Sequence, residues 1–233
     1  MRINSLMLAI GYQYKSCMRK RFPLRWRKAL IPNCTRHLCF ARNLAIGFLL
    51  FAMAYAIHGL QRSYGHDLNS KPVTSLTVPG AKEVVLFFTA TDCPISDRYI
   101  PEIEGLEKKF SAQHVIVWFV YPNVGETSDG IRHHEVDYGK ELHVLLDPHH
   151  RLVNLTHVGV TPESAILVPE DTGSEGYRVI YHGRIDNRYI QIGEQRPAAT
   201  QFDLERAIED SLDHRPVQKA DGPSVGCSII GEP

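Results

Sequence analysis

The sequence predicts an α/β domain whose central sheet is covered by helices. Two continuous apolar runs, at 84–88 and 115–121, are typical of strands that are buried on both faces of a sheet. The segment between them has one apolar stripe at helical spacing, formed by Ile95, Tyr99, Ile103, Leu106 and Phe110. Strands that alternate with helices in this way indicate a sheet with helices on both faces.

Beyond the second strand, the pattern predicts shorter elements of both kinds. They are a weak helix at 128–139, a strand at 142–146, a short helix at 150–157, and strands at 165–168 and 177–181. Thr200 and Asp203 match a capping box, which predicts the start of a last helix. The inner face of that helix is formed by Leu204, Ala207, Ile208 and Leu212.

Charge is divided unevenly along the chain. Residues 1–43 hold ten Lys or Arg and no acidic residue, although the whole chain has a net charge of zero. From Asp67 onwards the chain has 26 acidic residues and 15 Lys or Arg, which gives that region a formal charge of −11. Because neutralisation of phosphates needs a basic face, an acidic domain of this kind excludes nucleic acid as an expected partner.

The segment 44–60 has no formal charge and is long enough to cross a membrane. The basic leader before it should stay in the cytoplasm, so the rest of the chain is expected in the periplasm or an equivalent exported space. The segment is interpreted as one uncleaved transmembrane helix. Two alternatives stay open: secretion after cleavage near Ala54-Tyr55-Ala56, and a mitochondrial inner-membrane location, which an Arg-rich leader without acids also fits.

These boundaries predict five regions in the chain. After the leader at 1–43 and the anchor or signal sequence at 44–60, residues 61–80 are expected to form a linker. Residues 81–213 form the folded domain, and residues 214–233 form a polar C-terminal tail that carries Cys227.

Cys93 is the residue with the strongest chemical signal. It lies between a buried strand and a helix that Pro94 can start, because Pro is tolerated in the first helical turn. Free N–H groups and the helix dipole favour a thiolate at this position. Ser96 is placed to donate a hydrogen bond to the sulfur, whereas the carboxylates of Asp92 and Asp97 oppose a second negative charge.

The number and placement of the cysteines support a catalytic interpretation. Three of the five, Cys17, Cys34 and Cys39, precede the apolar segment and should lie in a reducing compartment. Cys93 and Cys227 follow it, where a disulfide can persist. Two exported cysteines are too few for a structural disulfide framework. No cofactor and no metal site is expected.

Three segments resemble the redoxin branch of the thioredoxin-like proteins, the relatives of alkyl hydroperoxide reductase and the thiol-specific antioxidant proteins. Residues 87–103, FFTATDCPISDRYIPEI, are similar to the active-site segment of these proteins, with Ser96 at the position of the second cysteine. Residues 145–169 are similar to the part that leads to their cis-proline, with Thr161-Pro162 as that dipeptide. The third segment is GRIDNR at 183–188, and the short GCSI sequence in the tail, which contains Cys227, is similar to the tail of the same branch.

The resemblance implies a thioredoxin-like fold, with a central mixed sheet flanked by helices. It also implies that Cys93 is the attacking thiol, that Pro162 sits against it, and that the backbone beside this proline pairs with extended substrates. The expected activity is that of a membrane-tethered, exported thiol-disulfide oxidoreductase or peroxiredoxin-like protein. Its substrates would be protein thiols and disulfides, or a peroxide.

The role of Cys227 follows from what the CPIS segment lacks. A single thiol at 93–96 cannot close its own disulfide, so a second cysteine has to resolve the intermediate if the reaction takes place within the chain. The tail is long enough to bring Cys227 back to Cys93. Cys227 is therefore either a resolving thiol or an unpaired cysteine in a free tail, and both hypotheses stay open.

Two other functions on the same fold also stay open. One is a copper-binding chaperone, because the chain has twelve histidines, including the pairs His133-His134 and His149-His150. The other is a non-catalytic docking domain, for which Cys93 would be unreactive. The stoichiometry of bound metal would identify the first, and the reactivity of Cys93 would distinguish the second.

The charge asymmetry around 44–60 leads to a test of topology. A reporter enzyme fused after Pro233 should be active only in an exported compartment, because the basic leader stays in the cytoplasm. A reporter that is active only in the cytoplasm would contradict this orientation.

Overall fold

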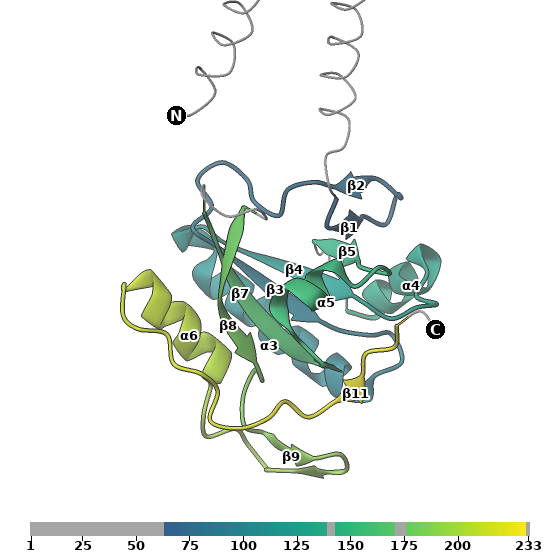
Figure 1. Cartoon of the computed structure of the whole chain (residues 1–233). Coiled ribbons are helices and arrows are strands. Elements are labelled where there is room, and N and C mark those ends of the chain that lie inside the picture. The colour runs from purple at the N-terminus through teal and green to yellow at the C-terminus, as the bar shows by residue number, and fades with distance from the viewer. Residues whose placement is uncertain (1–62, 139–142, 171–175, 232–233) are drawn as a thin grey trace, which may run out of the picture. The chain divides into compact units, whose positions relative to one another are not determined.

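The computed structural model describes residues 63–138, 143–170 and 176–231 (Figure 1). The basic leader at 1–43 and the apolar segment at 44–60, with the anchor predicted there, lie outside the described residues. Within the described ranges, no helix combines the length and the apolar character that crossing a bilayer requires.

A sheet of seven strands forms the centre of the fold, in the order β2-β1-β5-β4-β3-β7-β8. The strands are β1 (Gly65–His66), β2 (Pro72–Val73), β3 (Glu83–Phe88), β4 (Val115–Tyr121), β5 (Val144–Leu146), β7 (Glu163–Pro169) and β8 (Tyr177–Gly183). Strands β3, β4 and β5 run parallel, whereas β7 and β8 are antiparallel to their neighbours. The sheet is therefore mixed, and this arrangement is thioredoxin-like, as the resemblance implied.

Both faces of the sheet are covered, and the side chains of β3 alternate between two cores. Val85 and Phe87 belong to one core, while Leu86 and Phe88 belong to the other. This alternation is what the pleat of a strand dictates, and it explains why β3 is one continuous apolar run. All six residues of the strand are buried.

The helices divide between these faces. They are α3 (Pro94–Phe110), α4 (Ser128–Tyr138), α5 (Arg151–Thr156) and α6 (Asp203–Leu212), with a 3₁₀ turn, η2 (Ser111–Gln113), after α3. Buried residues of α3 and α6, such as Ile103 and Leu204, share the core of Phe87. Leu152 of α5 lies in the core on the opposite face. The strands and helices predicted after 84 are thus confirmed, with small shifts at their ends.

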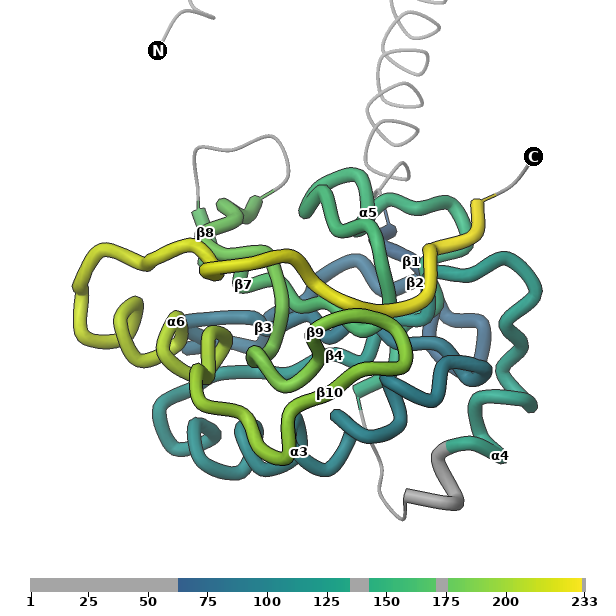
Figure 2. Tube along the Cα trace, turned by 90° about the horizontal axis from the view of Figure 1, so that it is seen from below, coloured from purple at the N-terminus to yellow at the C-terminus, as the bar shows by residue number. Residues whose placement is uncertain are grey.

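Two short pairs of strands lie outside the main sheet. β9 (Tyr189–Gln191) and β10 (Glu194–Gln195) form an antiparallel hairpin. β11 (Cys227–Ser228) pairs antiparallel with β6 (Val160–Thr161), which lies just before the cis Thr161–Pro162 bond. Figures 1 and 2 show the last segment of the chain running from α6 past the β9–β10 hairpin to β11.

The structure differs from the predicted linker at 61–80. Within that range, β1 and β2 extend the sheet, because His66 pairs with Leu146 of β5. A Cβ atom on Gly65 would lie 2.1 Å from the carbonyl oxygen of Leu146, so the edge depends on this glycine. Strands of two residues carry no apolar periodicity, which is why the sequence pattern did not indicate them.

The predicted capping box is also wrong. Phe202 is the N-cap residue of α6, and no side chain caps the helix. The hydroxyl of Thr200 instead accepts a hydrogen bond from the Asn187 amide, and the Asp203 carboxylate binds Arg184 and Arg206. Both polar residues of the motif are used in contacts that are distant in sequence, and these outweigh the local cap.

Candidate functional site

Cys93 lies in the loop between β3 and α3, at the N-cap position of the helix. Its side chain is 0% exposed. Its thiol donates a hydrogen bond to the carbonyl oxygen of Thr161, with a sulfur–oxygen distance of 3.1 Å. Pro94 starts the helix, so the sulfur is held at the positive end of the helix dipole, as the sequence predicted.

Cys227 reaches the same place from the far end of the chain. In the β11–β6 pair, Cys227 is opposite Thr161 and Ser228 is opposite Val160. Thr161 therefore touches Cys93 through its carbonyl group and lies beside Cys227 through strand pairing. Both cysteines are free thiols. Two residues that are more than a hundred positions apart in the sequence thus meet at the backbone of one threonine.

Gly226 makes this approach sterically possible. A Cβ atom at this position would lie 2.1 Å from the carbonyl oxygen of Thr161 and 2.9 Å from the nitrogen of Pro162. Both contacts are to backbone, which cannot rotate away as a side chain can. Only glycine allows β11 to lie this close to the strand before the cis-proline.

The segment after Cys227 is held by further hydrogen bonds. The N–H of Ile230 donates to the side-chain oxygen of Asn123 at 2.9 Å, and the N–H of Val124 donates to the Ile230 carbonyl at 3.1 Å. The N–H of Ile229 donates to the Gly159 carbonyl at 3.3 Å. The predicted polar tail at 214–233 is therefore docked on the domain through 231, and it covers Cys93.

The two thiols differ in acidity. Burial raises the pKa of Cys93, but hydrogen bonds from the Cys227 thiol and from the hydroxyl and N–H of Ser96 lower it, and the result is a pKa below its ordinary value. Burial also raises the pKa of Cys227, and the hydrogen bond to Cys93 and the charge of its thiolate bring it to about 11. Cys93 is thus the more acidic of the two thiols.

The hydroxyl of Ser96 is buried beside this pair without a partner, as is the hydroxyl of Thr161. The Ser96 side chain is 0% exposed, and its oxygen makes no hydrogen bond to another described residue while Cys93 is a thiol. An unsatisfied buried hydroxyl is costly, and a thiolate acceptor removes that cost. Ser96 is therefore placed so that a thiolate at Cys93 would give its hydroxyl a partner.

The loop after β4 makes hydrogen bonds near both cysteines, and no sequence pattern indicated this. The Glu126 carboxylate accepts hydrogen bonds from the N–H and the hydroxyl of Thr91, each at 2.9 Å. Thr91 is two residues before Cys93, and Asn123 in the same loop holds the segment that follows Cys227. Neither residue belongs to a local motif, so only the spatial arrangement reveals this role.

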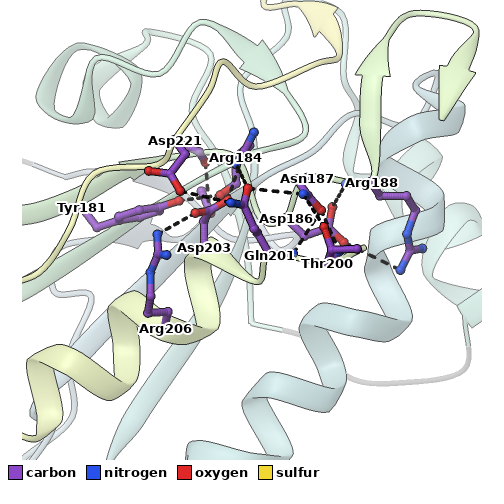
Figure 3. Close-up of polar contacts among 12 residues, drawn as sticks. Tyr181, Arg184, Asp186, Asn187, Arg188, Thr200, Gln201, Asp203, Arg206 and Asp221 are labelled. Carbon is purple, nitrogen blue, oxygen red and sulfur yellow. Dashed lines mark hydrogen bonds and ion pairs between the residues drawn. The ribbon is translucent and has the colours of Figure 1, made fainter. Parts of the chain in front are cut away.

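A polar network anchors the chain before it reaches Cys227 (Figure 3). The Asp203 carboxylate accepts from Arg184 at 2.6 Å and from Arg206 at 2.7 Å. Gln201 accepts from Arg184 and donates to Asp221 of the tail. The 184–188 segment, which the resemblance singled out, thus connects the start of α6 to the tail.

A second buried cluster lies on the inner side of α3. The Tyr99 hydroxyl donates to Asp186, and Arg188 bridges Glu102 at 3.2 Å and Asp186 at 3.7 Å. Burial raises the pKa of Glu102 to about 6, the charge of Asp186 adds to this rise, and Arg188 opposes it. The cluster therefore holds two carboxyl groups against one guanidinium.

In each histidine pair of the copper-binding alternative, one ring is hydrogen-bonded to a group elsewhere in the fold. His134 lies 2.9 Å from an Asp97 oxygen and 3.2 Å from the Tyr121 hydroxyl, and His150 lies 2.9 Å from the Pro122 carbonyl. Across 63–138, 143–170 and 176–231, no three or more His, Cys, Asp or Glu side chains are grouped so that they could hold a metal ion.

Comparisons with known proteins give the fold and little more. No family model and no curated protein matches the chain. A solved structure of an uncharacterized conserved protein from Geobacillus kaustophilus has 16% identity and a TM-score of 0.57, over 73% of this chain and 88% of that one. A hypothetical protein from Sinorhizobium meliloti has 19% identity and a TM-score of 0.52, over 65% of this chain and 81% of that one.

A third solved structure, a secreted disulfide oxidoreductase from Mycobacterium tuberculosis, has 13% identity and a TM-score of 0.42. It covers 66% of this chain and 96% of that one. At this level of similarity it carries no argument about the present site, which therefore has to be interpreted from its own geometry.

The steric role of Gly226 can be tested by substitution. In Gly226→Ala the tail should leave β6 more often. The loss of two backbone hydrogen bonds at about 1 kcal/mol each would raise the population of chains with an undocked tail roughly thirtyfold. Alkylation of Cys93 by iodoacetamide, followed by peptide mass spectrometry, should accelerate to the same extent. Gly105→Ala is the matched control, because nothing lies within 4 Å of a Cβ atom there. Equal alkylation rates in both variants would show that the tail does not cover Cys93.

The raised pKa of Glu102 predicts a pH-dependent stability. Because the pKa is higher in the folded chain, the contribution of Glu102 to stability is full below about pH 4.5 and is lost as the pH rises through about 6. Glu102→Gln should therefore raise the free energy of unfolding by up to about 2 kcal/mol at pH 7.5 and leave it unchanged at pH 4. Urea unfolding at both pH values measures this. Glu194→Gln on the exposed hairpin is the control, and a parallel change in that variant would contradict the assignment.

Proposed function

We propose that this chain is an exported thiol oxidoreductase that cycles between a Cys93/Cys227 dithiol and a Cys93–Cys227 disulfide. The observation that carries this proposal is the pairing of β11 with β6, which seats Cys227 against Thr161 beside the buried Cys93. A second thiol at this place supplies what the CPIS segment lacks. Of the two hypotheses for Cys227, the proposal therefore adopts the resolving thiol.

The cycle begins with the Cys93 thiolate as the nucleophile. When it attacks a substrate disulfide, a Cys93–substrate mixed disulfide forms and the first substrate sulfur leaves as a thiolate. When it attacks a peroxide, Cys93 becomes a sulfenic acid and an alcohol or water leaves. In both cases, Cys93 loses its negative charge.

The loss of that charge activates Cys227. The thiolate of Cys93 is one cause of the raised pKa of Cys227, so this pKa falls once Cys93 has reacted. Cys227 then gives up its proton and attacks the Cys93 sulfur. The second substrate thiol, or water, leaves with that proton, and the chain keeps the disulfide. Two thiols are oxidised, and one disulfide or peroxide bond is reduced.

The supporting residues have separate roles in this proposal. Ser96 donates hydrogen bonds from its hydroxyl and its N–H to the thiolate, and Pro94 starts the helix so that its N-terminus lies at the sulfur. Thr161 orients the Cys93 sulfur through its carbonyl group. Pro162 shapes the groove beside β6, which an extended substrate would enter in place of β11.

Burial of Cys93 restricts what can react with it. A protein disulfide needs the tail to move away from β6, whereas a small oxidant needs only a local opening. The same burial is what the alternative of a non-catalytic docking domain would require. The two interpretations differ in what they predict after oxidation. The oxidoreductase should form a Cys93–Cys227 disulfide, whereas the docking domain should keep Cys93 unmodified.

The compartment forms part of the proposal. The basic leader and the apolar segment at 44–60 support a single-pass anchor with the redox domain in the periplasm or an equivalent space. A disulfide cycle needs a compartment in which disulfides persist, which agrees with this orientation.

Replacement of the resolving thiol tests the proposal. The wild-type chain, treated with one equivalent of a peroxide or of a disulfide, should lose two thiols and form a Cys93–Cys227 bond. In Cys227→Ser, Cys93 should remain as a persistent adduct, and turnover should fall about 10²-fold, because an intramolecular attack is lost. Mass spectrometry identifies the adduct, and Ser228→Ala is the neighbouring control.

Three results would contradict the proposed cycle. Unchanged turnover in Cys227→Ser would assign resolution to an external thiol. A Cys93 that stays unmodified by both oxidants would favour the docking domain. A disulfide that joins Cys227 to another chain, with Cys93 free, would remove Cys93 from the reaction.

A further inference from the structure

Only one of the two sulfurs of the pair borders an open cavity. Cys93 is 0% exposed, whereas Cys227 is partly exposed. Cys227 lines a cavity of about 340 Å³ between the first turn of α3 and the β9–β10 hairpin. The two thiols are hydrogen-bonded beside Thr161, so they are near neighbours, and the Cys227 end of a disulfide between them would still border this cavity.

The cavity has apolar walls next to the sulfur. Ile95 of α3 forms one side, and Tyr189 and Ile192 of the hairpin form the other. Ile192 is 73% exposed and Ile190 is 45% exposed, so the hairpin presents two large aliphatic side chains to solvent. Apolar side chains that project around a reactive centre are typical of a surface that receives another protein.

The rim of the cavity also carries charged groups. Arg98 donates to the Gln195 side chain at 3.3 Å, and Glu194 accepts from Gln191 at 2.9 Å. The Arg98 contact joins the hairpin to α3, the Glu194 contact lies within the hairpin, and the two residues give the rim both signs of charge. A small anionic thiol would find no cationic pocket here, whereas a protein segment can match both the apolar wall and the polar rim.

We infer that the cavity beside Cys227 is the docking site of a protein dithiol, which reduces the Cys93–Cys227 disulfide by attacking the sulfur of Cys227. The inference rests on the proposed function, because it requires that this disulfide forms. It adds the class of the reductant, the sulfur that is attacked and the surface that selects the partner.

The electrons balance in two steps. The first thiolate of the partner bonds to the Cys227 sulfur, the Cys93–Cys227 bond breaks, and Cys93 leaves as a thiolate. The second thiol of the partner then attacks its own first sulfur in the mixed disulfide, and Cys227 leaves and takes up the proton. The partner dithiol becomes a disulfide, and both cysteines of the chain are reduced.

The chemistry of the leaving group supports this direction of attack. Ser96 and the start of α3 stabilise Cys93 as a thiolate, and the sulfur of lower pKa leaves faster. Attack at Cys93 would expel Cys227, whose pKa is raised by burial even when Cys93 carries no charge. The less accessible sulfur is thus the better leaving group, and the accessible one is the better target.

The attacked sulfur can be identified by trapping. The oxidised full chain is mixed with a thioredoxin whose second active-site cysteine has been replaced by serine, so that the first mixed disulfide accumulates. Peptide mass spectrometry should place the thioredoxin on Cys227. A mixed disulfide on Cys93 would overturn the inference and leave the proposed function standing. If oxidation produces no Cys93–Cys227 bond, the proposed function fails as well.

The docking surface is tested by a substitution on the hairpin. Ile192→Ser should slow reduction by intact thioredoxin about tenfold and leave reduction by dithiothreitol unchanged, because the small thiol needs no apolar contact. Val78→Ser is the matched control, since Val78 is 60% exposed and does not line this cavity. If Ile192→Ser slows neither reductant, or slows both equally, the hairpin does not select a protein partner and the inference is wrong.

Discussion

The close contact between Gly226–Cys227 and the backbone of Thr161 is the constraint on which the rest of the site depends. It brings β11 onto β6, covers Cys93, and places a second thiol where the active-site segment has serine. The contact is made by main-chain atoms, so it depends on the absence of a side chain at 226. Hydrogen bonds from Gln201 to Asp221 and from Ile230 to Asn123 hold the segment on either side of Cys227, and they fix the direction in which the chain arrives.

The same contact explains why two chemically equivalent thiols become different. Each sulfur lies in the electrostatic field of the other. Only Cys93 is at a helix N-terminus, where the Ser96 hydroxyl has no other partner. The charge therefore settles on Cys93, and the raised pKa of Cys227 is partly a consequence of that charge. A reaction at either sulfur changes the proton affinity of the other, so the pair behaves as one titrating unit.

The sequence predicted those parts of the fold that depend on local patterns. The apolar runs of β3 and β4 and the stripe of α3 are such patterns, and so is the placement of Cys93 after Phe88 and before Pro94. The resemblance to redoxins added Thr161 and Pro162. The docked tail could not be predicted in the same way, since β11 has two residues and its partner lies far back in the chain. Asn123 and Glu126 were missed for the same reason, as each acts across the fold.

The position of β11 late in the sequence has a consequence for biosynthesis. Contacts between distant parts of a chain form late in folding, and the N-terminal part of a chain leaves the ribosome first. The sheet and α3 can assemble before residues 226–230 arrive, so a newly made chain passes through a stage in which Cys93, the more acidic thiol of the pair, has no cover and no second cysteine beside it. During that interval Cys93 is open to overoxidation and to mixed disulfides with other proteins. The cell that makes this protein therefore has to keep Cys93 reduced until the end of the chain has folded back.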